Sequence, residues 1–151
     1  HMEFRIPGRP VPLGRHRSAI GYRKNGSAYI RQYQDPQSRQ AKSLIQMIAQ
    51  SAMRASRNHP AVETPLCVTC EFCIARPKTV TRGWPTVKPD LDNYVKLVLD
   101  ALNGIAWQDD AQVCELVARK RYADNRDNIG IHITIEESNH ESASDGAFHR
   151  G

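Results

Sequence analysis

The sequence predicts an α+β domain in which a mixed β-sheet packs against two main helices. Alternating apolar and polar residues indicate strands, and apolar residues at helical spacing indicate helices. The elements follow one another as strand, hairpin, helix, strand, helix, strand and strand. The predicted strands cover residues 3–6, 66–74, 113–122 and 129–136, the hairpin residues 22–30, and the helices residues 36–57 and 91–103.

The length of 151 residues, 40% of them hydrophobic, suits one domain with its own core. We assign residues 3–136 to that domain and interpret His1-Met2 as a cloning scar. Residues 137–151 are polar and are interpreted as a mobile tail without a catalytic role. No apolar run could span a membrane and no signal peptide is visible, so we expect a soluble intracellular protein.

Charge is unevenly distributed along the chain, whose formal net charge is +5. Residues 1–59 hold eleven Lys and Arg against two acidic residues, whereas residues 60–135 hold nine against ten. Cations that hold phosphates, beside acids that hold metal ions, are expected of a metal nuclease. A solvated basic surface that binds no partner is the alternative.

The N-terminal third carries the candidate nucleic-acid surface. The first strand ends at Pro7-Gly8, a basic loop follows, and the hairpin turns at Asn25-Gly26. Tyrosines alternate with cations there, which suits a phosphate backbone and unstacked bases. A flexible loop of ordinary tyrosines is the alternative. The candidate DNA-binding residues of this region are Arg9, Arg15, Arg17, Arg23, Lys24 and Arg31.

The first helix has a strong start signal, with Asp35 as N-cap and Pro36 at the first helical position. It ends before Pro60, which cannot continue it. The helical spacing predicts a buried stripe made of Ala41, Leu44, Ile45, Ile48 and Ala52.

Three cysteines, Cys67, Cys70 and Cys73, lie in the strand over residues 66–74. A zinc site is disfavoured because Cys70 points to the opposite face, the other two lie roughly 20 Å apart, and a fourth ligand is missing. We interpret these thiols, and Cys114, as small hydrophobic residues. Nothing in the pattern requires disulfides, in line with a reducing cytoplasm.

Two further side chains are interpreted as structural. We expect Trp84 to pack into the core, with stacking on a base as the alternative, because tryptophan is largely buried in most proteins. His132 lies on the polar face of the last strand, where a structural role is favoured over a catalytic one.

The second helix begins at a pair of carboxylates. Asp90 and Asp92 flank Leu91 just after a proline, and Lys96 follows one helical turn later. Apolar residues at helical spacing separate the buried face from this polar side. Gly104 lies where a C-terminal cap is expected.

A second pair of carboxylates, Asp109 and Asp110, precedes the strand over residues 113–122. Carboxylates from two element ends, with a lysine nearby, suit a hard cation such as Mg²⁺. Each residue also has an ordinary explanation as an N-cap, a helix-dipole partner, a surface ion pair or a solvated turn. Asp90 and Asp92 would, however, repel each other without a counter-ion.

Three runs of residues resemble the RusA family of Holliday junction resolvases. They are the Lys-Pro-Asp-Leu-Asp-Asn run at 88–93 with the following Lys96, the Leu-Asp-Ala-Leu-Asn-Gly run at 99–104, and the Trp-Gln-Asp-Asp-Ala-Gln-Val run at 107–113. The resemblance extends over most of the chain, from residue 2 to about residue 136. In one respect the chain departs from the pattern: an arginine run before the first aspartate is thinned to Arg82 and Lys88. That departure bears on DNA affinity more than on catalysis.

The resemblance implies an α+β homodimer, cytoplasmic, from a bacterium or encoded by a phage or prophage. The family's metal-binding aspartates correspond to Asp90, Asp92 and Asp110 and its essential lysine to Lys96, with Asp109 in a supporting role. The implied activity is a Mg²⁺-dependent endodeoxyribonuclease, with Mn²⁺ as a substitute ion. It would resolve four-way (Holliday) DNA junctions by paired symmetric nicks in recombination and repair. Lys88 joins the candidate DNA-binding residues.

We therefore expect Asp90, Asp92 and Asp110 to converge on one divalent ion, with the Lys96 ammonium in reach of the same phosphate. A structure that separates Asp110 from the other two would count against the enzyme. Two rival hypotheses are a non-catalytic, structure-selective DNA-binding protein and a metal nuclease that acts on flaps or other branched DNA. Sequence leaves open whether Trp84 or Tyr94 contacts DNA.

Overall fold

The computed structural model describes residues 1–57 and 59–139. Its elements have the predicted order and the predicted α+β character, with two α-helices in the described part of the chain. Two short 3₁₀ turns lie at Asp110–Gln112 and Arg126–Asn128. The strands and helices are β1 (Met2–Pro7), β2 (Arg17–Tyr22), β3 (Ala28–Tyr33), α1 (Pro36–Ser56), β4 (Leu66–Ile74), α2 (Leu91–Leu102), β5 (Val113–Tyr122) and β6 (Gly130–Glu137).

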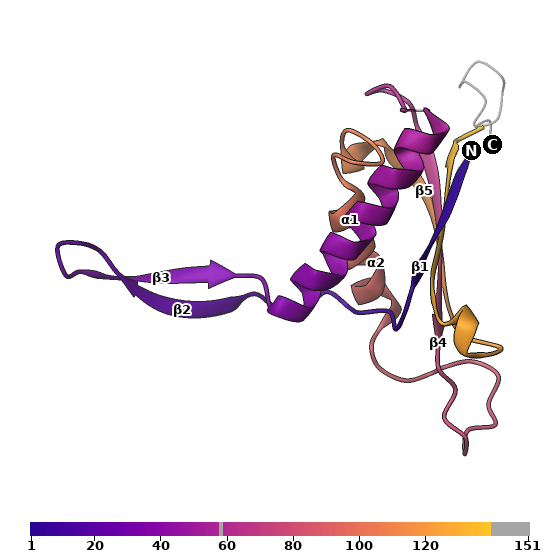
Figure 1. Ribbon diagram of the computed structural model, residues 1–151, viewed down its shortest axis with the longest axis horizontal. Helices are drawn as coiled ribbons and strands as arrows, with labels where there is room; N and C mark the ends of the chain where they lie inside the picture. The colour runs from indigo at the N-terminus through magenta and orange to yellow at the C-terminus, as the bar shows by residue number, and fades with distance from the viewer. Residues whose placement is uncertain (58, 140–151) are drawn as a thin grey trace, which may run out of the picture.

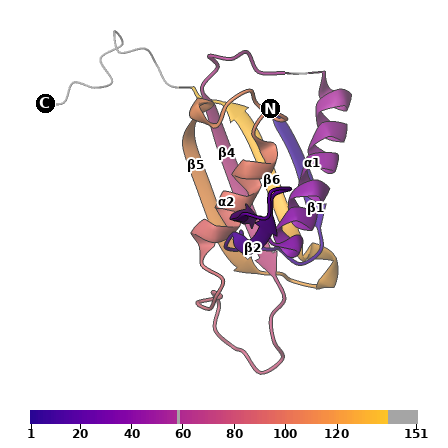
Figure 2. The same cartoon turned by 90° about the vertical axis from the view of Figure 1, so that its left-hand side faces the viewer.

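Four strands form one mixed sheet in the order β1-β6-β4-β5. β6 is antiparallel to both β1 and β4, whereas β4 and β5 are parallel. Parallel neighbours require a crossover connection, and α2 lies in the one between β4 and β5. Both helices cover the same face of the sheet (Figures 1 and 2), so α2 is fixed between the sheet and solvent.

The core lies between the helices and the sheet. The alternation predicted for β4 is confirmed: Val68, Cys70 and Phe72 face the helices and are fully buried. Tyr94 of α2 is buried as well and stacks on Phe72, with ring centroids 5.1 Å apart. Tyr94 therefore belongs to the core and is not a surface for DNA.

The buried stripe of α1 differs from the prediction. Ile45 is buried as expected, but Ala49 and Met53 complete the stripe, and Leu44 is exposed. The predicted Ala41, Ile48 and Ala52 are half-buried at its margins. The buried stripe is rotated around the helix because α1 packs against both α2 and β1. Periodicity alone does not show which neighbours a helix contacts, so it does not give the direction of the stripe.

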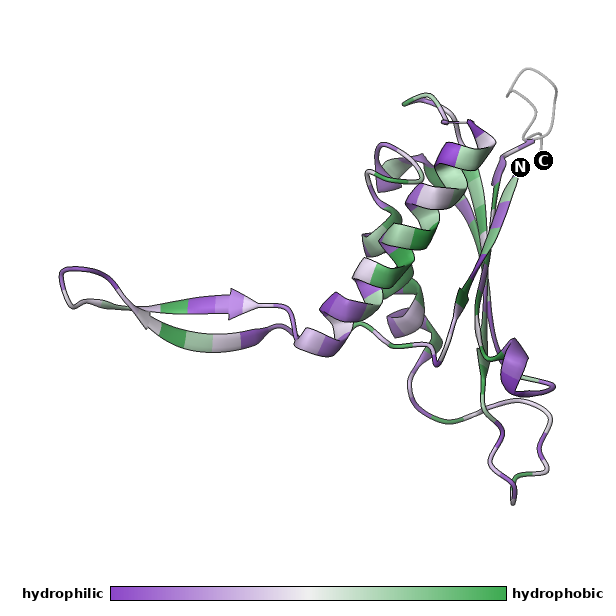
Figure 3. Ribbon diagram, in the orientation of Figure 1, coloured by the Kyte–Doolittle hydropathy of each residue, from purple (hydrophilic) through white to green (hydrophobic). Residues whose placement is uncertain are grey.

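β2 and β3 form a separate two-stranded hairpin that extends away from the rest of the domain (Figure 1). It is longer than the predicted residues 22–30, although the turn is at the predicted Asn25-Gly26, where Gly26 has a φ of +86°. Apolar residues lie in both strands (Figure 3). Ile20 and Ile30 face each other across the strands and are 69% and 74% exposed.

Three further predictions concern the two ends of the chain and Trp84. Met2, interpreted as part of a cloning scar, is buried and pairs with Ile135 in the sheet. Trp84, expected in the core, is 58% exposed, so that prediction is wrong. Of the predicted tail 137–151, Glu137 belongs to β6, and residues 140–151 lie outside the described residues. No helix in the described ranges is long and apolar enough to cross a membrane.

Candidate functional site

Asp90 is the N-cap residue of α2, but its side chain accepts no capping hydrogen bond. The carboxylate is more than half exposed, and the Lys88 ammonium lies 3.3 Å from its Oδ1 atom. N-cap aspartates ordinarily bond to a backbone N–H of the first turn. The Asp90 carboxylate is therefore not used by the helix and stays accessible to a ligand.

Asp92 and Lys96 form the ion pair expected from their i, i+4 spacing, at 3.5 Å. Both side chains are mostly exposed, so the pair contributes little to stability. With Asp90 and Lys88, it gives the N-terminal end of α2 two carboxylates and two ammonium groups. Carboxylates are favoured near a helix N-terminus, which offsets part of their mutual repulsion.

Asp110 lies near the other end of α2. Its Oδ1 atom accepts a hydrogen bond of 2.8 Å from the indole N–H of Trp107, and its backbone N–H donates to Oδ1 of Asn103, the C-cap of α2. The neighbouring Asp109 accepts from the backbone N–H of Ala111 and completes a capping box with Gln112. Asp109 is thus the N-cap of the short 3₁₀ turn that begins at Asp110.

The three aspartates do not converge within one chain. The 12 residues of α2 separate the Asp90 end from the Asn103 end, a length of about 18 Å at 1.5 Å per residue. Among the described residues, no group of three acidic, histidine or cysteine side chains is arranged to hold a metal ion. The expectation of convergence is therefore wrong for the single chain, because the helix holds the two carboxylate pairs apart. The oxygen donors suit Mg²⁺ in kind, and Asp90 and Asp92 lie two positions apart at the same end of α2.

Lys120 on β5 is a residue of this site that the sequence analysis missed. Its ammonium donates to the carbonyl oxygens of Val87 (2.6 Å) and Pro89 (2.8 Å), on either side of Lys88. These bonds fix the loop that delivers Asp90 to α2. The sequence signal was only a basic strand end, which does not distinguish a tether from a phosphate contact.

Arg9 reaches the same end of α2. Burial raises the pKa of Tyr94, and the positive charge of Arg9 acts on this phenol in the opposite direction. The backbone N–H of Leu13 donates to the carbonyl of Asn93, 2.9 Å away, so the basic loop runs beside the first turn of α2. Of the predicted DNA-binding residues, Lys88 therefore pairs with Asp90, and the charge of Arg9 acts on the phenol of Tyr94 in the first turn of α2.

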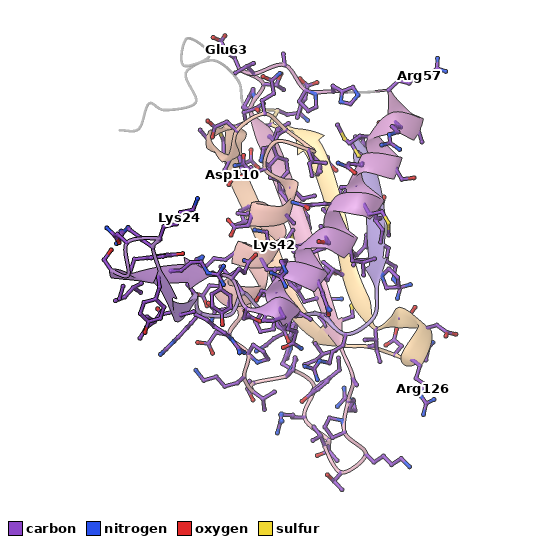
Figure 4. The ribbon with its side chains drawn as sticks, turned by 60° about the vertical axis from the view of Figure 1, so that its left-hand side comes forward. Lys24, Lys42, Arg57, Glu63, Asp110 and Arg126 are labelled. Atoms are coloured by element: carbon purple, nitrogen blue, oxygen red, sulfur yellow. The ribbon has the colours of Figure 1, made fainter. Side chains whose placement is uncertain are left out.

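The remaining predicted cations lie on or near the hairpin, whose two faces differ. Arg17 and Arg31 share one face, where the Arg31 guanidinium lies over the Tyr33 ring and the Arg23 guanidinium over the Tyr29 ring. Lys24 projects from the turn (Figure 4). The opposite face is uncharged and consists of Ser18, Ile20, Tyr22, Ala28, Ile30 and Gln32.

Arg15 and Arg17 line a shallow depression at the base of the hairpin, together with Asp35 and Ser38. The Ser38 hydroxyl donates to the Asp35 carboxylate and lowers the pKa of that carboxyl, and the charge of Arg17 lowers it further. Asp35 is thus a structural carboxylate, distinct from the ones on α2.

Cys70 behaves as the small hydrophobic residue that was predicted, but Cys114 is exposed, so the same interpretation of Cys114 is wrong. Burial raises the pKa of Cys70 to about 12, whereas Cys67 and Cys73 are half-buried on the other face of β4. His132 pairs with the Glu3 carboxylate across the sheet, which agrees with the structural interpretation.

Comparisons with known proteins identify the class. The family Endodeoxyribonuclease RusA matches residues 7–136. The chain is also similar to the uncharacterized protein YqaN of Bacillus subtilis (strain 168), with 32% identity over 136 residues, 82% of this chain and 89% of that protein. The chain belongs to the RusA family of endodeoxyribonucleases, as the sequence runs around α2 suggested. Membership implies an endodeoxyribonuclease that binds branched DNA.

Proposed function

We propose that this protein is a Mg²⁺-dependent endonuclease that resolves four-way DNA junctions by paired nicks during recombination and repair. Family membership supports the reaction class. The observation that carries the proposal is the Asp90 carboxylate, which makes no capping bond, is more than half exposed and is paired with Lys88 at the end of a tethered loop, with the Asp92–Lys96 pair in the same first turn of α2. A purely structural N-cap would be bonded to its own helix.

The separation of Asp110 from Asp90 leads us to place the active site between two copies of the chain. A homodimer is symmetric, so each contact between copies occurs twice. If two α2 helices lie antiparallel about the twofold axis, the Asp90 end of each meets the Asp110 end of the other. Two equivalent sites then arise, which matches the two strands that a junction resolvase must cut.

Mg²⁺ held by Asp90, Asp92 and Asp110 would polarise the scissile phosphate and lower the pKa of the attacking water. Lys96 is assigned the neutralisation of negative charge that grows on the phosphate, which is the largest electrostatic demand of the reaction. Lys88 and Arg9 hold the strand on either side, because both lie at the same end of α2. Mn²⁺ has similar ligand preferences and is expected to substitute for Mg²⁺.

The two faces of the hairpin suit two partners. Its cationic face, with Arg17, Arg23 and Arg31, and Lys24 at the turn suit the phosphate backbone of a junction arm. Its uncharged face exposes Ile20 and Ile30, and a two-stranded hairpin alone in water is only marginally stable. We assign that face to the second copy. In sedimentation experiments, Ile20→Lys is expected to weaken the dimer, whereas Ser18→Lys at the rim of the same face should change it little.

The divided site is tested by mixing two inactive variants, Asp90→Asn and Asp110→Asn. In a mixed dimer, one site receives both substitutions and the other receives neither. Nicking of a labelled four-way junction should therefore return in the mixture, although paired cutting should not. If each chain carried its own complete site, every site in the mixture would be defective and no nicking would return.

A non-catalytic, structure-selective DNA-binding protein is the second candidate. It is favoured by one observation, that the described residues of one chain gather no three-carboxylate cluster. It predicts metal-independent junction binding with no product under any condition. A labelled four-way junction, a flap and a plain duplex, each with and without Mg²⁺, distinguish this candidate from a resolvase and from a flap nuclease.

A further inference from the structure

The loop between β4 and α2 presents an exposed tryptophan among cations. Trp84 is 58% exposed, an unusual position for the largest apolar side chain. Residues 72–89 include no acidic residue. Their four cationic residues are Arg76, Lys78, Arg82 and Lys88. A loop of this charge attracts a polyanion and repels a basic protein surface.

The last three residues of β5 hold this loop in place. Lys120 donates to the carbonyl oxygens of Val87 and Pro89, the Arg121 guanidinium lies 5.6 Å from the centroid of the Trp84 ring, and the Arg76 guanidinium lies 4.3 Å from that of Tyr122. Arg76 also donates to the Arg82 carbonyl across the loop. Trp84 is thus exposed on an anchored segment rather than on a free one.

Trp84 and the Asp90 carboxylate belong to the same anchored segment. Asp90 is six positions after Trp84, so their Cα atoms lie at most about 22 Å apart. A nucleic-acid strand whose phosphate reaches Asp90 therefore passes within about six nucleotides of the indole, since successive phosphates in a strand are about 3.4 Å apart along a duplex axis. Paired bases are stacked on one another and offer no face to an indole, whereas an unpaired base does.

We propose that Trp84, with Arg121 over its ring, is a stacking platform for an unpaired base close to the strand that Asp90 addresses. The inference rests on the proposed nuclease function, but it concerns recognition and not cleavage. An aromatic ring provides a face for any base, so the platform recognises an unstacked nucleotide and not a sequence. Trp84 would then be a specificity-determining residue for branched or opened DNA.

The two tryptophans of the chain make a direct test feasible, because Trp107 is 2% exposed and a DNA-dependent change in emission reports on Trp84. The full chain, without divalent metal, is titrated with a single-stranded oligonucleotide, the same strand carrying abasic sites, and heparin as a polyanion without bases. We expect quenching by the first alone. Trp84→Phe, which keeps only the Trp107 signal, should show no quenching.

Affinity supplies the second measurement. Trp84→Leu should bind the intact oligonucleotide about tenfold or more weakly and heparin unchanged, and Trp84→Phe should restore most of the affinity. Arg82→Gln, a charge control in the same loop, should weaken both ligands and reduce the salt slope by about 0.7. Circular dichroism checks that each variant is folded.

Three results would overturn the platform: equal quenching by the abasic strand, equal loss of heparin binding in Trp84→Leu, or an emission that changes with protein concentration alone, which would mean that a second copy covers the indole. The nuclease proposal fails separately. Junction cutting without Trp84 quenching contradicts the platform only, and quenching without metal-dependent cutting contradicts the nuclease only.

Discussion

Asp35 and Asp90 occupy the same position at the start of the two helices, and each is adjacent to a proline, yet their side chains do different things. The Asp35 carboxylate is buried and accepts hydrogen bonds from the backbone N–H and the hydroxyl of Ser38. The Asp90 carboxylate is exposed, makes no side-chain capping bond to its helix, and is paired with Lys88. A carboxylate that makes no capping hydrogen bond to its helix is available to bind a ligand.

The contrast also separates stability from activity. Asp35 connects the base of the hairpin to α1, and its pKa is lowered by bonds that exist only in the folded chain. Asp90 contributes little to the helix that it begins, because the capping bond is missing. Substitutions at the two positions should therefore affect different quantities. A substitution of Asp35 should lower the free energy of unfolding, and a substitution of Asp90 should lower the rate of cleavage.

The largest expected effect is on cleavage. Asp90→Asn should reduce metal-dependent cutting of a four-way junction by about a thousandfold or more, because several kcal/mol of charge stabilisation depends on the ion. Junction binding in the absence of metal and the melting temperature should stay within error. Gel-based cleavage, a binding titration and thermal unfolding measure the three quantities. Simultaneous loss of binding would mean that Asp90 holds the loop and not an ion.

Lys120→Met should have the next largest effect. Without its two hydrogen bonds, the loop at Val87 and Pro89 is no longer fixed, and a displacement of about 1 Å at Asp90 can cost about a hundredfold in rate. We expect kcat to fall by about 10- to 100-fold with a smaller change in KM.

Arg119→Met is the matched control on the same strand, since Arg119 is exposed. It should leave kcat unchanged. Equal effects of the two substitutions would point to a general loss of positive charge, and the tether would then have no special role.

Asp35→Ala should destabilise the fold by about 0.5–2 kcal/mol, the usual value of an N-cap, while the cleavage rate per folded molecule stays the same. Urea unfolding measures the free energy. Asp35→Asn is the control, because asparagine is also a good N-cap. A loss of activity in Asp35→Ala without a loss of stability would reverse the comparison between the two aspartates.

The smallest expected effect depends on pH. The folded-state pKa of Asp35 lies below the ordinary value of 3.8, so its contribution is present above that pH and is lost as the pH falls through the folded-state pKa. Between pH 5 and pH 2.5, the wild-type chain should therefore lose more unfolding free energy than Asp35→Asn. Urea titrations at several pH values give the unfolding free energy of each chain, and the difference between their two decreases with falling pH measures this contribution. Equal decreases in the two chains would contradict it.

Local patterns were enough for most of the fold. The alternation in residues 66–74, the Asp35-Pro36 start of α1, the Asn25-Gly26 turn and the Gly104 end of α2 are consequences of backbone geometry within a few residues. The predicted order of elements follows from them. The direction of the buried stripe of α1 could not be predicted, since it depends on which neighbours the helix contacts.

The sequence by itself determined the type and order of the elements, which carboxylates and lysines lie at the start of α2, and the family to which the motif belongs. Only the tertiary structure decided that Asp110 is held a helix length from Asp90, that Lys120 tethers the loop before it, and that Trp84 remains on the surface. The physical reason is the range, along the chain, of the interactions that decide each feature. Caps, turns and alternation are fixed by neighbours in the chain, whereas the distance between two carboxylates and the exposure of a ring depend on how separate elements pack.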